Sequence, residues 1–362
     1  MGGSLHATRR PGMALRLAAL GLAVAGAGAA QGKTLHRDFR LMRGDLQTYG
    51  DWLAGCDATP SCTLIGLPAP LDALDADGPA SRDMAVRIEA LGAGNGTPVV
   101  ELIPLGAAPP ANALRKADAC RLRLSTKAVA ALVKVPCDRA VLPDADAERL
   151  LKALTDGDDI TGVVPGQPAQ VFRFPAQGSA QALQALQRRR AAFARRAANA
   201  DGPVPHRLPA RELMVSGFSP IFAANRCGAQ AMRAMRHFRF ANGTEMWSHQ
   251  CAEADPARTW WVMNRDPLAA GTPLDLPEPR GGPVAAGRDG LENAVFDWDF
   301  GVLRSYAYVM GHEDCGVMRA WGFTAQGWRL LERREMPLCR GLEPSDWIRT
   351  HFTPSNGAGP DE

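Results

Sequence analysis

The stretch that decides the fold is HEDCGVMRAWGFTAQGWRLLERREMPLCRG, residues 312–341. Two runs rich in apolar and aromatic residues, Val317–Phe323 and Trp328–Glu332, flank the break Ala325-Gln326-Gly327. Runs of this length and composition on either side of a glycine-containing turn are typical of a β-hairpin. We therefore predict that this region of the chain is built from antiparallel strands.

The aromatic side chains of this hairpin predict a core layer. Successive side chains of a strand point to opposite faces, so Trp321 and Phe323 share one face of the first strand. By the same rule Trp328 and Leu330 share a face of the second strand. If those faces coincide, the four side chains form one apolar layer in the core of the domain.

Working outward, residues 210–352 form one tryptophan-rich β domain, which holds seven of the eight tryptophans of the chain. Further runs of β-branched, aromatic and other apolar residues predict strands at Phe238–Phe240, Glu245–His249, Thr259–Met263 and Val302–Val309. Glycine, proline and aspartate separate these runs. Short strands between such breaks are typical of a sandwich or barrel-like fold.

The preceding region, residues 35–198, predicts a second β-rich domain with two helices. Met84, Val86 and Ile88 are apolar and are interleaved with Arg87 and Glu89, which is the period-two pattern of a strand. Asp146 and Ser179 are each suited to begin a helix, because their side-chain oxygens can accept backbone N–H groups of the first helical turn.

A proline-rich linker, residues 199–209, separates the two predicted domains, and residues 353–362 are expected to form a flexible tail. The fold class that follows is mainly β with a few helices (α+β). It consists of two disulfide-stapled β-rich domains, each of them sandwich-like or barrel-like.

Eight cysteines predict a disulfide framework, because they fall into four couples that are close in sequence. The alternative, a zinc site, is disfavoured because the chain contains no Cys-x-x-Cys pair. Each of the three longer loops would stabilise the fold by roughly 3 kcal/mol. The predicted bonds are Cys56–Cys62, Cys120–Cys137, Cys227–Cys251 and Cys315–Cys339.

Residues 1–30 have the pattern of a cleavable signal peptide. Arg9, Arg10 and Arg16 form a basic segment, the run Leu17–Ala25 is apolar but too short to span a bilayer, and small residues precede Gln31. We expect export to the periplasm or secretion from a bacterial cell. The sequence leaves open whether translation starts at Met1 or at Met13.

The charge of the exported chain argues against a nucleic-acid partner. The full sequence has 41 basic and 38 acidic side chains, and signal cleavage removes three arginines and no acidic residue. The resulting neutral balance provides no electrostatic footprint for nucleic acid. No later segment is long and apolar enough for a membrane helix, so we expect no membrane span after signal cleavage.

Tryptophans, cysteines and glycines recur in a distinctive order: Asp51-Trp52, Cys56-Asp57, Cys62, Cys227, Trp247, Cys251, Asp314-Cys315-Gly316, Trp321, Gly327-Trp328 and Cys339-Arg340-Gly341. In this order the chain resembles domain-of-unknown-function family 1176, a family of exported proteobacterial proteins, from about residue 38 to residue 350. The first domain also resembles the invasion-associated locus B family, a disulfide-bearing envelope domain. These resemblances imply a fold and a location but no activity.

The densest cluster of ionisable side chains is His312-Glu313-Asp314, with Asp297 and Asp299 upstream at strand spacing. An imidazole and two carboxylates are suited to metal binding or acid–base chemistry. The other interpretation, which we favour, is a polar turn that enters a disulfide-tethered hairpin. We therefore assign no metal ligands, no catalytic residues and no cofactor.

Trp260 and Trp261 are the candidate binding aromatics, because adjacent tryptophans could line a sugar or peptide groove. Core packing is the competing explanation for them. Exposure of both on one surface would favour binding.

Three functional classes remain open. The leading one is a non-catalytic envelope protein that binds a protein, peptide or glycan partner or maintains the envelope. The second is a hydrolase or metal-dependent enzyme that uses the region of Asp297, Asp299 and His312. The third is a structural, stress-protective envelope component. The sequence does not identify a ligand, an oligomeric state or a physiological role.

The signal peptide predicts a defined processed product. When the full chain is produced in a Gram-negative host, N-terminal sequencing of the protein recovered from the periplasm should start between Ala30 and Gly32. Cytoplasmic protein that keeps an intact Met1 or Met13 would contradict this prediction.

Overall fold

The structure is a computed structural model that describes residues 46–57, 61–68, 82–90, 97–105, 121–127, 129, 132–165, 167–175, 177–196, 206–215, 232–251, 258–264, 272–278, 284, 286, 289–309 and 312–353. Residues 36–362 belong to one compact unit. The predicted signal peptide and residues 354–362 of the predicted tail lie outside the described residues.

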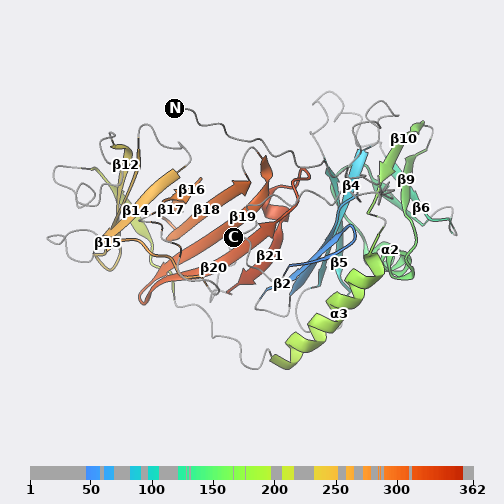
Figure 1. Ribbon diagram of the computed structural model, residues 1–362, viewed down its shortest axis with the longest axis horizontal. Coiled ribbons are helices and arrows are strands. Elements are labelled where there is room, and N and C mark those ends of the chain that lie inside the picture. The colour runs from blue at the N-terminus through green and yellow to red at the C-terminus, as the bar shows by residue number, and fades with distance from the viewer. Residues whose placement is uncertain are drawn as a thin grey trace, which may run out of the picture. The chain divides into compact units, whose positions relative to one another are not determined.

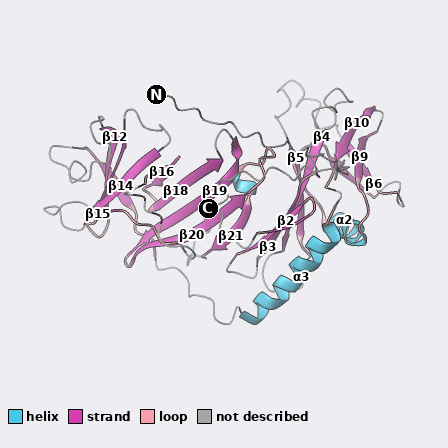
Figure 2. Cartoon of the chain, in the orientation of Figure 1, coloured by secondary structure: helices cyan, strands magenta, loops and turns pink. Residues whose placement is uncertain are grey.

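Figures 1 and 2 show a fold dominated by strands, arranged in three sheets, with two described helices. The first sheet is ten-stranded, with the order β1-β2-β3-β4-β10-β9-β6-β7, and with β5 paired to β4 and β8. Its strands are β1 (Gln47–Tyr49), β2 (Trp52–Cys56), β3 (Cys62–Gly66), β4 (Arg82–Ala90), β5 (Val99–Leu105), β6 (Arg121–Ser125), β7 (Val133–Pro136), β8 (Ala140–Val141), β9 (Thr161–Val164) and β10 (Gln167–Arg173). The strand predicted at residues 84–88 is thereby confirmed.

Strands β2 and β3 are buried at every position, which explains why their sequences show no alternation of apolar and polar residues. Trp52 packs in one core cluster with apolar residues of the two helices described below. Leu53 packs in another cluster with Trp347 and Ile348. Gly55 is required at its position, because a Cβ there would lie 2.4 Å from Ile348 Cγ2. The sheet is therefore covered on both faces at β2 and β3.

The two described helices cover one side of this sheet (Figure 1). They are α2 (Asp144–Asp156) and α3 (Ser179–Arg196). Helix α2 begins two residues before the predicted N-cap Asp146, with Pro143 at the cap position, and it ends at Gly157, which has the left-handed conformation. The hydroxyl of Ser179 donates to the carbonyl of Leu154, so it ties α3 to the end of α2.

The second sheet contains β11 (Ala210–Leu213), β12 (Met232–Phe240), β13 (Glu245–Cys251), β14 (Arg258–Asn264) and β15 (Thr272–Pro273), with β16 (Leu291–Glu292) paired to β14. The third sheet runs β17 (Val295–Asp297), β18 (Val302–Val309), β19 (His312–Thr324), β20 (Gly327–Met336) and β21 (Ile348–Phe352). A short 3-10 turn, Pro344–Asp346, precedes β21. Every strand predicted in this region is confirmed.

An aromatic core lies between the second and third sheets. Phe240 of the second sheet and Phe323 of the third have ring centres 4.1 Å apart, and Phe238 meets Phe296 edge-on at 4.8 Å. Trp261 belongs to the same buried cluster. This packing of one sheet face on another confirms a sandwich-like arrangement, and no sheet of the described residues closes into a barrel.

The predicted hairpin is confirmed in its register and its packing. Phe323 pairs with Trp328 and Trp321 with Leu330, so the predicted faces coincide. All four side chains lie in or against the aromatic core cluster. The aromatic layer inferred from residues 312–341 therefore exists and joins the two sheets of the sandwich.

Two of the predicted disulfides lie within the described residues. Cys56 is bonded to Cys62 where β2 ends and β3 begins, at the connected end of these two strands, and Cys315 is bonded to Cys339 at the open end of the β19–β20 hairpin. Cys137 and Cys251 are also disulfide-bonded. Their predicted partners, Cys120 and Cys227, lie outside the described residues, so those two pairings stay predictions.

The two predicted domains share a core cluster. Leu53 and Ile65 of the first sheet pack with Met318, Trp347 and Ile348 of the C-terminal region. In the predicted linker, the described residues 206–209 are hydrogen-bonded to the third sheet, since the N–H of residue 208 donates to the carbonyl of residue 323. The division into two independently folding domains stays a prediction.

His249 of β13 is a fully buried histidine within the fold. Its ring stacks on Trp260, with 5.9 Å between the ring centres. Neither ring nitrogen has a hydrogen-bond partner among the described residues. Burial lowers the pKa of His249 from 6.5 to about 4, because the surroundings desolvate the charged imidazolium and no nearby carboxylate compensates.

This pKa predicts a loss of stability in acid. Between pH 6.5 and pH 4 the unfolded chain binds a proton at His249 that the folded chain does not, so lowering the pH favours unfolding. This change of the pKa from 6.5 to about 4 corresponds to about 3 kcal/mol. A His249→Phe variant keeps a ring beside Trp260 but binds no proton. Between pH 7 and pH 4, urea unfolding should show that it loses about 3 kcal/mol less than the wild type; an equal loss would contradict the assignment.

Candidate functional site

The predicted polar cluster lies at the beginning of β19, beside a disulfide. His312 is half-exposed, and its Nδ1 lies 4.0 Å from Oδ1 of Asp314. The other oxygen of Asp314 accepts the backbone N–H of Gly341, which has a positive φ of 78°. Asp314 therefore holds the loop after Cys339 against the start of β19. Glu313, which lies between His312 and Asp314 in the sequence, is exposed.

The same place is the candidate metal centre of the described residues. Ligand atoms of His312, Asp314 and Cys339 lie within 4.8 Å of one another. Cys339 is bonded to Cys315, however, and a disulfide sulfur is not the thiolate that binds metals. An imidazole and one carboxylate remain, which is fewer than the three or four protein ligands of a typical zinc site.

Asp297 and Asp299 do not join this cluster. Asp297 pairs with Val302 at one end of β18, whereas His312 pairs with Val309 at the other end. The seven intervals along β18 correspond to roughly 23 Å at about 3.3 Å per residue. Asp297 instead accepts the N–H of Phe300 within a turn. The His and carboxylate set weighed for catalysis is therefore not assembled.

Trp260 and Trp261 are buried rather than displayed on one surface. They are adjacent in β14, so their side chains point to opposite faces of the sheet. Trp261 lies in the aromatic core, and Trp260 stacks on His249. Both are less than a tenth exposed. The condition that would have favoured a tryptophan binding surface is not met.

A groove that the sequence did not indicate lies on the third sheet. Its volume is about 30 Å³, far below the roughly 300–1,000 Å³ that is usual for ligand sites, so it is a small hollow. It is lined from all four long strands of the sheet and from the segment that precedes β11. The lining residues are Arg207, Val302, Arg304, Ala320, Leu331, Glu332, Phe352 and Thr353.

The floor of the groove is apolar. Val302, Ala320 and Leu331 are each less than a tenth exposed and form a buried cluster of their own, separate from the aromatic core. Phe352 of β21 closes one side, and the guanidinium of Arg349 lies 4.4 Å from the centre of its ring. Because these floor residues are already nearly removed from water, a ligand would bury little additional apolar surface on them.

The rim of the groove carries two arginines and one glutamate. Glu332 is already paired with Arg334, whose Nε lies 2.6 Å from its Oε1. Arg304 lies 3.7 Å from Asp297, which is a loose contact. For Arg207 no ion pair is found with any described residue. The local balance therefore favours a ligand with a negative charge.

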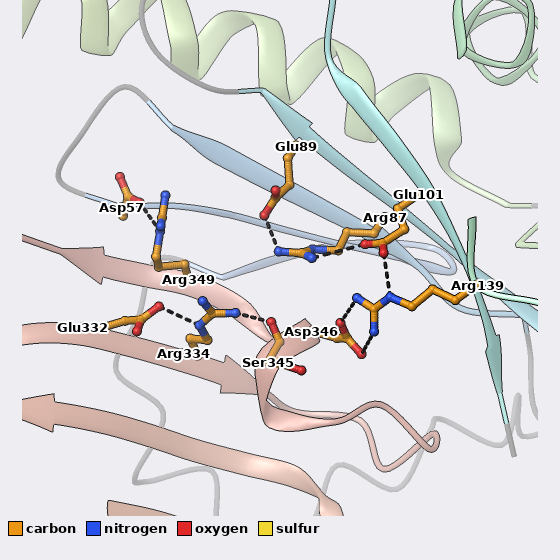
Figure 3. A network of polar contacts seen from close by, with 10 residues as sticks. All are labelled: Asp57, Arg87, Glu89, Glu101, Arg139, Glu332, Arg334, Ser345, Asp346 and Arg349. Carbon is orange, nitrogen blue, oxygen red and sulfur yellow. Dashed lines mark hydrogen bonds and ion pairs between the residues drawn. The ribbon is translucent and has the colours of Figure 1, made fainter. Parts of the chain in front are cut away.

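A network of charges holds the first sheet to the C-terminal region, and Figure 3 draws it together with the Glu332–Arg334 pair of the groove rim. Arg139 binds Glu101 of β5 and both carboxylate oxygens of Asp346, and these carboxylates raise the pKa of Arg139 above its usual value. Arg349 donates to Asp57 at 2.7 Å. Because each carboxylate of this network already has its cation, we interpret it as structural.

A second group of paired charges is buried on the face of the β19–β20 hairpin opposite the groove. Glu278 accepts from Arg319 at 2.5 Å and from Arg333 at 2.8 Å. Burial lowers the pKa of Arg319 from its usual value, although Glu278 opposes the shift. Charges that are paired so closely and buried so deeply serve packing specificity rather than ligand exchange.

Residues 46–354 match the model of the family described as "Protein of unknown function (DUF1176)". The match covers most of the chain. The chain belongs to the DUF1176 family. No curated protein and no solved structure matches this DUF1176 chain significantly. The resemblance of its first region to the invasion-associated locus B family stays a prediction.

None of the described helices is long and apolar enough to span a bilayer.

Asp314 and His312 of the polar cluster are predicted to contribute differently to the stability of the fold. Asp314→Ala should lower the free energy of unfolding by about 1–2 kcal/mol, because it removes a charge-assisted acceptor of the Gly341 N–H. Asp314→Asn keeps an acceptor and should lose less. His312→Ala should change stability by less than about 0.5 kcal/mol, since the side chain is half-exposed. Urea unfolding measures all three; an undiminished stability of Asp314→Ala would show that this carboxylate does not hold the loop.

Proposed function

We propose that this DUF1176 protein is an exported binding protein of the bacterial cell envelope, periplasmic or secreted, that acts without catalysis. The N-terminal segment supports export, because a basic stretch, a short apolar run and small residues follow one another within residues 1–30. The disulfides support the same compartment, since such bonds persist in oxidising environments.

The observation that carries the binding function is the groove on the third sheet. It combines a buried apolar floor, Val302, Ala320 and Leu331, with a charged rim. Few polar groups around an apolar concavity are the usual composition of a small-molecule site, in which the polar groups orient the ligand. The floor residues come from hydrogen-bonded strands, and the hollow above them is only about 30 Å³, so a ligand would lie across the surface around it rather than inside it.

The residues that we considered for a hydrolase are not arranged for catalysis. Asp297 and His312 lie at opposite ends of β18, and Asp314 is engaged by a backbone N–H group. General acid–base chemistry requires its groups to reach one substrate atom at hydrogen-bond distance. We therefore favour binding over the hydrolase.

Thermal-shift measurements with the disulfide-bonded chain test this proposal. A panel of fatty acids, short peptides and oligosaccharides should contain one class that raises the melting temperature by several degrees at 100 times its Kd, a stabilisation of about 2.7 kcal/mol. An Ala320→Leu variant, which fills the floor of the groove, should lose this shift.

The matched control is Ala145→Leu, the same substitution on an exposed position of α2. It should keep the full shift. A panel without any stabilising class would contradict a binding function, and an equal shift in Ala320→Leu and the wild type would show that the groove is not the site.

A further inference from the structure

We propose that reduction of the Cys315–Cys339 disulfide completes a zinc site at the beginning of β19, where both thiolates, His312 and Asp314 bind one Zn²⁺ ion. Among the described residues, the disulfide-bonded chain offers only the imidazole and the carboxylate there. The site therefore exists in one redox state of the protein and not in the other. The inference is independent of the groove and goes beyond the proposed function, because it gives the protein a metal-binding state controlled by thiol chemistry.

The start of β19 brings the four residues together. Ligand atoms of His312, Asp314 and Cys339 lie within 4.8 Å of one another, and the sulfur of Cys315 is bonded to that of Cys339. The pairing of β18 with β19 is interrupted here, since Gly316 and His312 face adjacent residues of β18 although residues 313–315 lie between them. A bulge releases its residues from strict alternation, so side chains that would otherwise point to opposite faces of the sheet can approach one point.

Reduction raises the number of ligands at this point from two to four. A dithiol reductant attacks one sulfur of the disulfide, forms a mixed disulfide and releases the other sulfur as a thiolate, and its second thiol then displaces the remaining protein sulfur. Two electrons and two protons pass to Cys315 and Cys339, and the reductant becomes a disulfide. Binding of Zn²⁺ then displaces the thiol protons. Two thiolates, one imidazole and one carboxylate form the four-coordinate set that suits zinc.

The distances in the disulfide-bonded chain are close to those that zinc requires. Nδ1 of His312 lies 4.0 Å from Oδ1 of Asp314. Two such atoms on a tetrahedral zinc ion, each bonded at about 2.0–2.1 Å, lie about 3.3 Å apart. Two thiolates bonded at about 2.3 Å lie about 3.8 Å apart, so the two sulfurs must separate once their bond is broken. Cys339 lies beyond the end of β20, so its movement leaves the pairing of the strands unchanged.

A backbone contact already orients the carboxylate. One oxygen of Asp314 accepts the N–H of Gly341, and the other oxygen is the one that lies near His312. Carboxylates that bind metals are usually hydrogen-bonded in this way, and the second contact fixes their orientation. The residue that holds the loop after Cys339 therefore also presents an oxygen to the ion.

Exposure favours this disulfide as the one that is reduced. His312 is half-exposed and Cys339 is partly exposed, so a reductant and a metal ion can reach them from solvent. Cys56 and Cys62 are only 6% and 1% exposed. Thiol–disulfide exchange requires access to a sulfur atom. Of the two disulfides whose partners are both described, the bond of Cys339 is therefore expected to react first.

A variant that frees Cys339 without a reductant tests the site while the other disulfides stay bonded. Cys315→Ala leaves a thiol, an imidazole and a carboxylate, and it should bind one Zn²⁺ ion in isothermal titration calorimetry. The disulfide-bonded wild type should bind at least about a hundredfold more weakly, because loss of a ligand costs more than the tenfold to hundredfold that loss of its supporting contact costs. Co²⁺ in place of Zn²⁺ should show a thiolate-to-metal charge-transfer band in the variant alone.

The reduced wild type tests the complete set of ligands. After limited reduction with dithiothreitol and removal of the reductant without oxygen, alkylation and peptide mapping should find Cys315 and Cys339 labelled before Cys56 and Cys62. The unlabelled reduced chain should bind Zn²⁺ more tightly than Cys315→Ala, because it adds a second thiolate. Near-ultraviolet circular dichroism and melting temperatures establish that each form is folded.

Substitutions in the Cys315→Ala background assign the other ligands. His312→Ala and Asp314→Asn should each weaken Zn²⁺ by at least about tenfold. The matched control is Glu313→Gln, which removes the exposed carboxylate between these two residues and should leave the affinity unchanged.

Three outcomes would overturn the proposal. Folded Cys315→Ala and folded reduced wild type that bind Zn²⁺ no more tightly than the disulfide-bonded chain would show that the thiolates complete no site. An affinity that His312→Ala and Asp314→Asn leave unchanged would place the ion elsewhere. Labelling of Cys56 and Cys62 before Cys339 would show that this disulfide is not the redox-sensitive one.

Discussion

Burial of β2 and β3 on both faces is the interaction on which the rest of the structure depends. Helix α3 packs on one face of these strands, and Ile348 and Trp347 from the last strand region pack on the other. Because β21 is hydrogen-bonded to β20, this contact fixes the whole five-stranded third sheet to the first sheet. Ion pairs surround the apolar contact, among them those of Arg139 with Asp346 and of Arg349 with Asp57 (Figure 3). The apolar area supplies most of the free energy, and the ion pairs restrict the orientation in which it is buried.

This contact also explains where the groove lies. Alternate residues of β18 occupy one face of the third sheet. Tyr306 and Tyr308 pack against the core shared with the first sheet, whereas Val302 and Arg304 line the groove. The first sheet therefore covers only part of that face and leaves the rest to Arg207 and to solvent. The opposite face of the third sheet lies on the aromatic core. One sheet thus serves the sandwich, the contact with the first sheet and the candidate site.

The candidate site could not be predicted from the sequence, although parts of its signal were present. Ala320 and Gly322 are small residues within a strand, which often marks a place where another group approaches closely. Nothing in the sequence indicates that this group is Arg207, more than a hundred residues earlier. The sequence drew attention instead to Asp297, Asp299 and the cluster at His312, because ionisable residues that are close in sequence are conspicuous. In the structure the length of β18 separates the aspartates from His312. The carboxylate of Asp314 accepts a hydrogen bond from the backbone N–H of Gly341.

The sequence by itself determined the features that depend on local spacing. The hairpin around Gly327, its aromatic face and the Cys315–Cys339 bond follow from side-chain alternation and from short separations along the chain. The end of α2 at Gly157 follows from the left-handed conformation that glycine adopts without strain. Only the tertiary structure decided that β2 and β3 are covered twice, that Trp260 is buried and that Arg207 lies above Gly322. Each of these depends on which distant segment arrives at a surface, and apolar burial is non-directional, so a local pattern does not specify its partner.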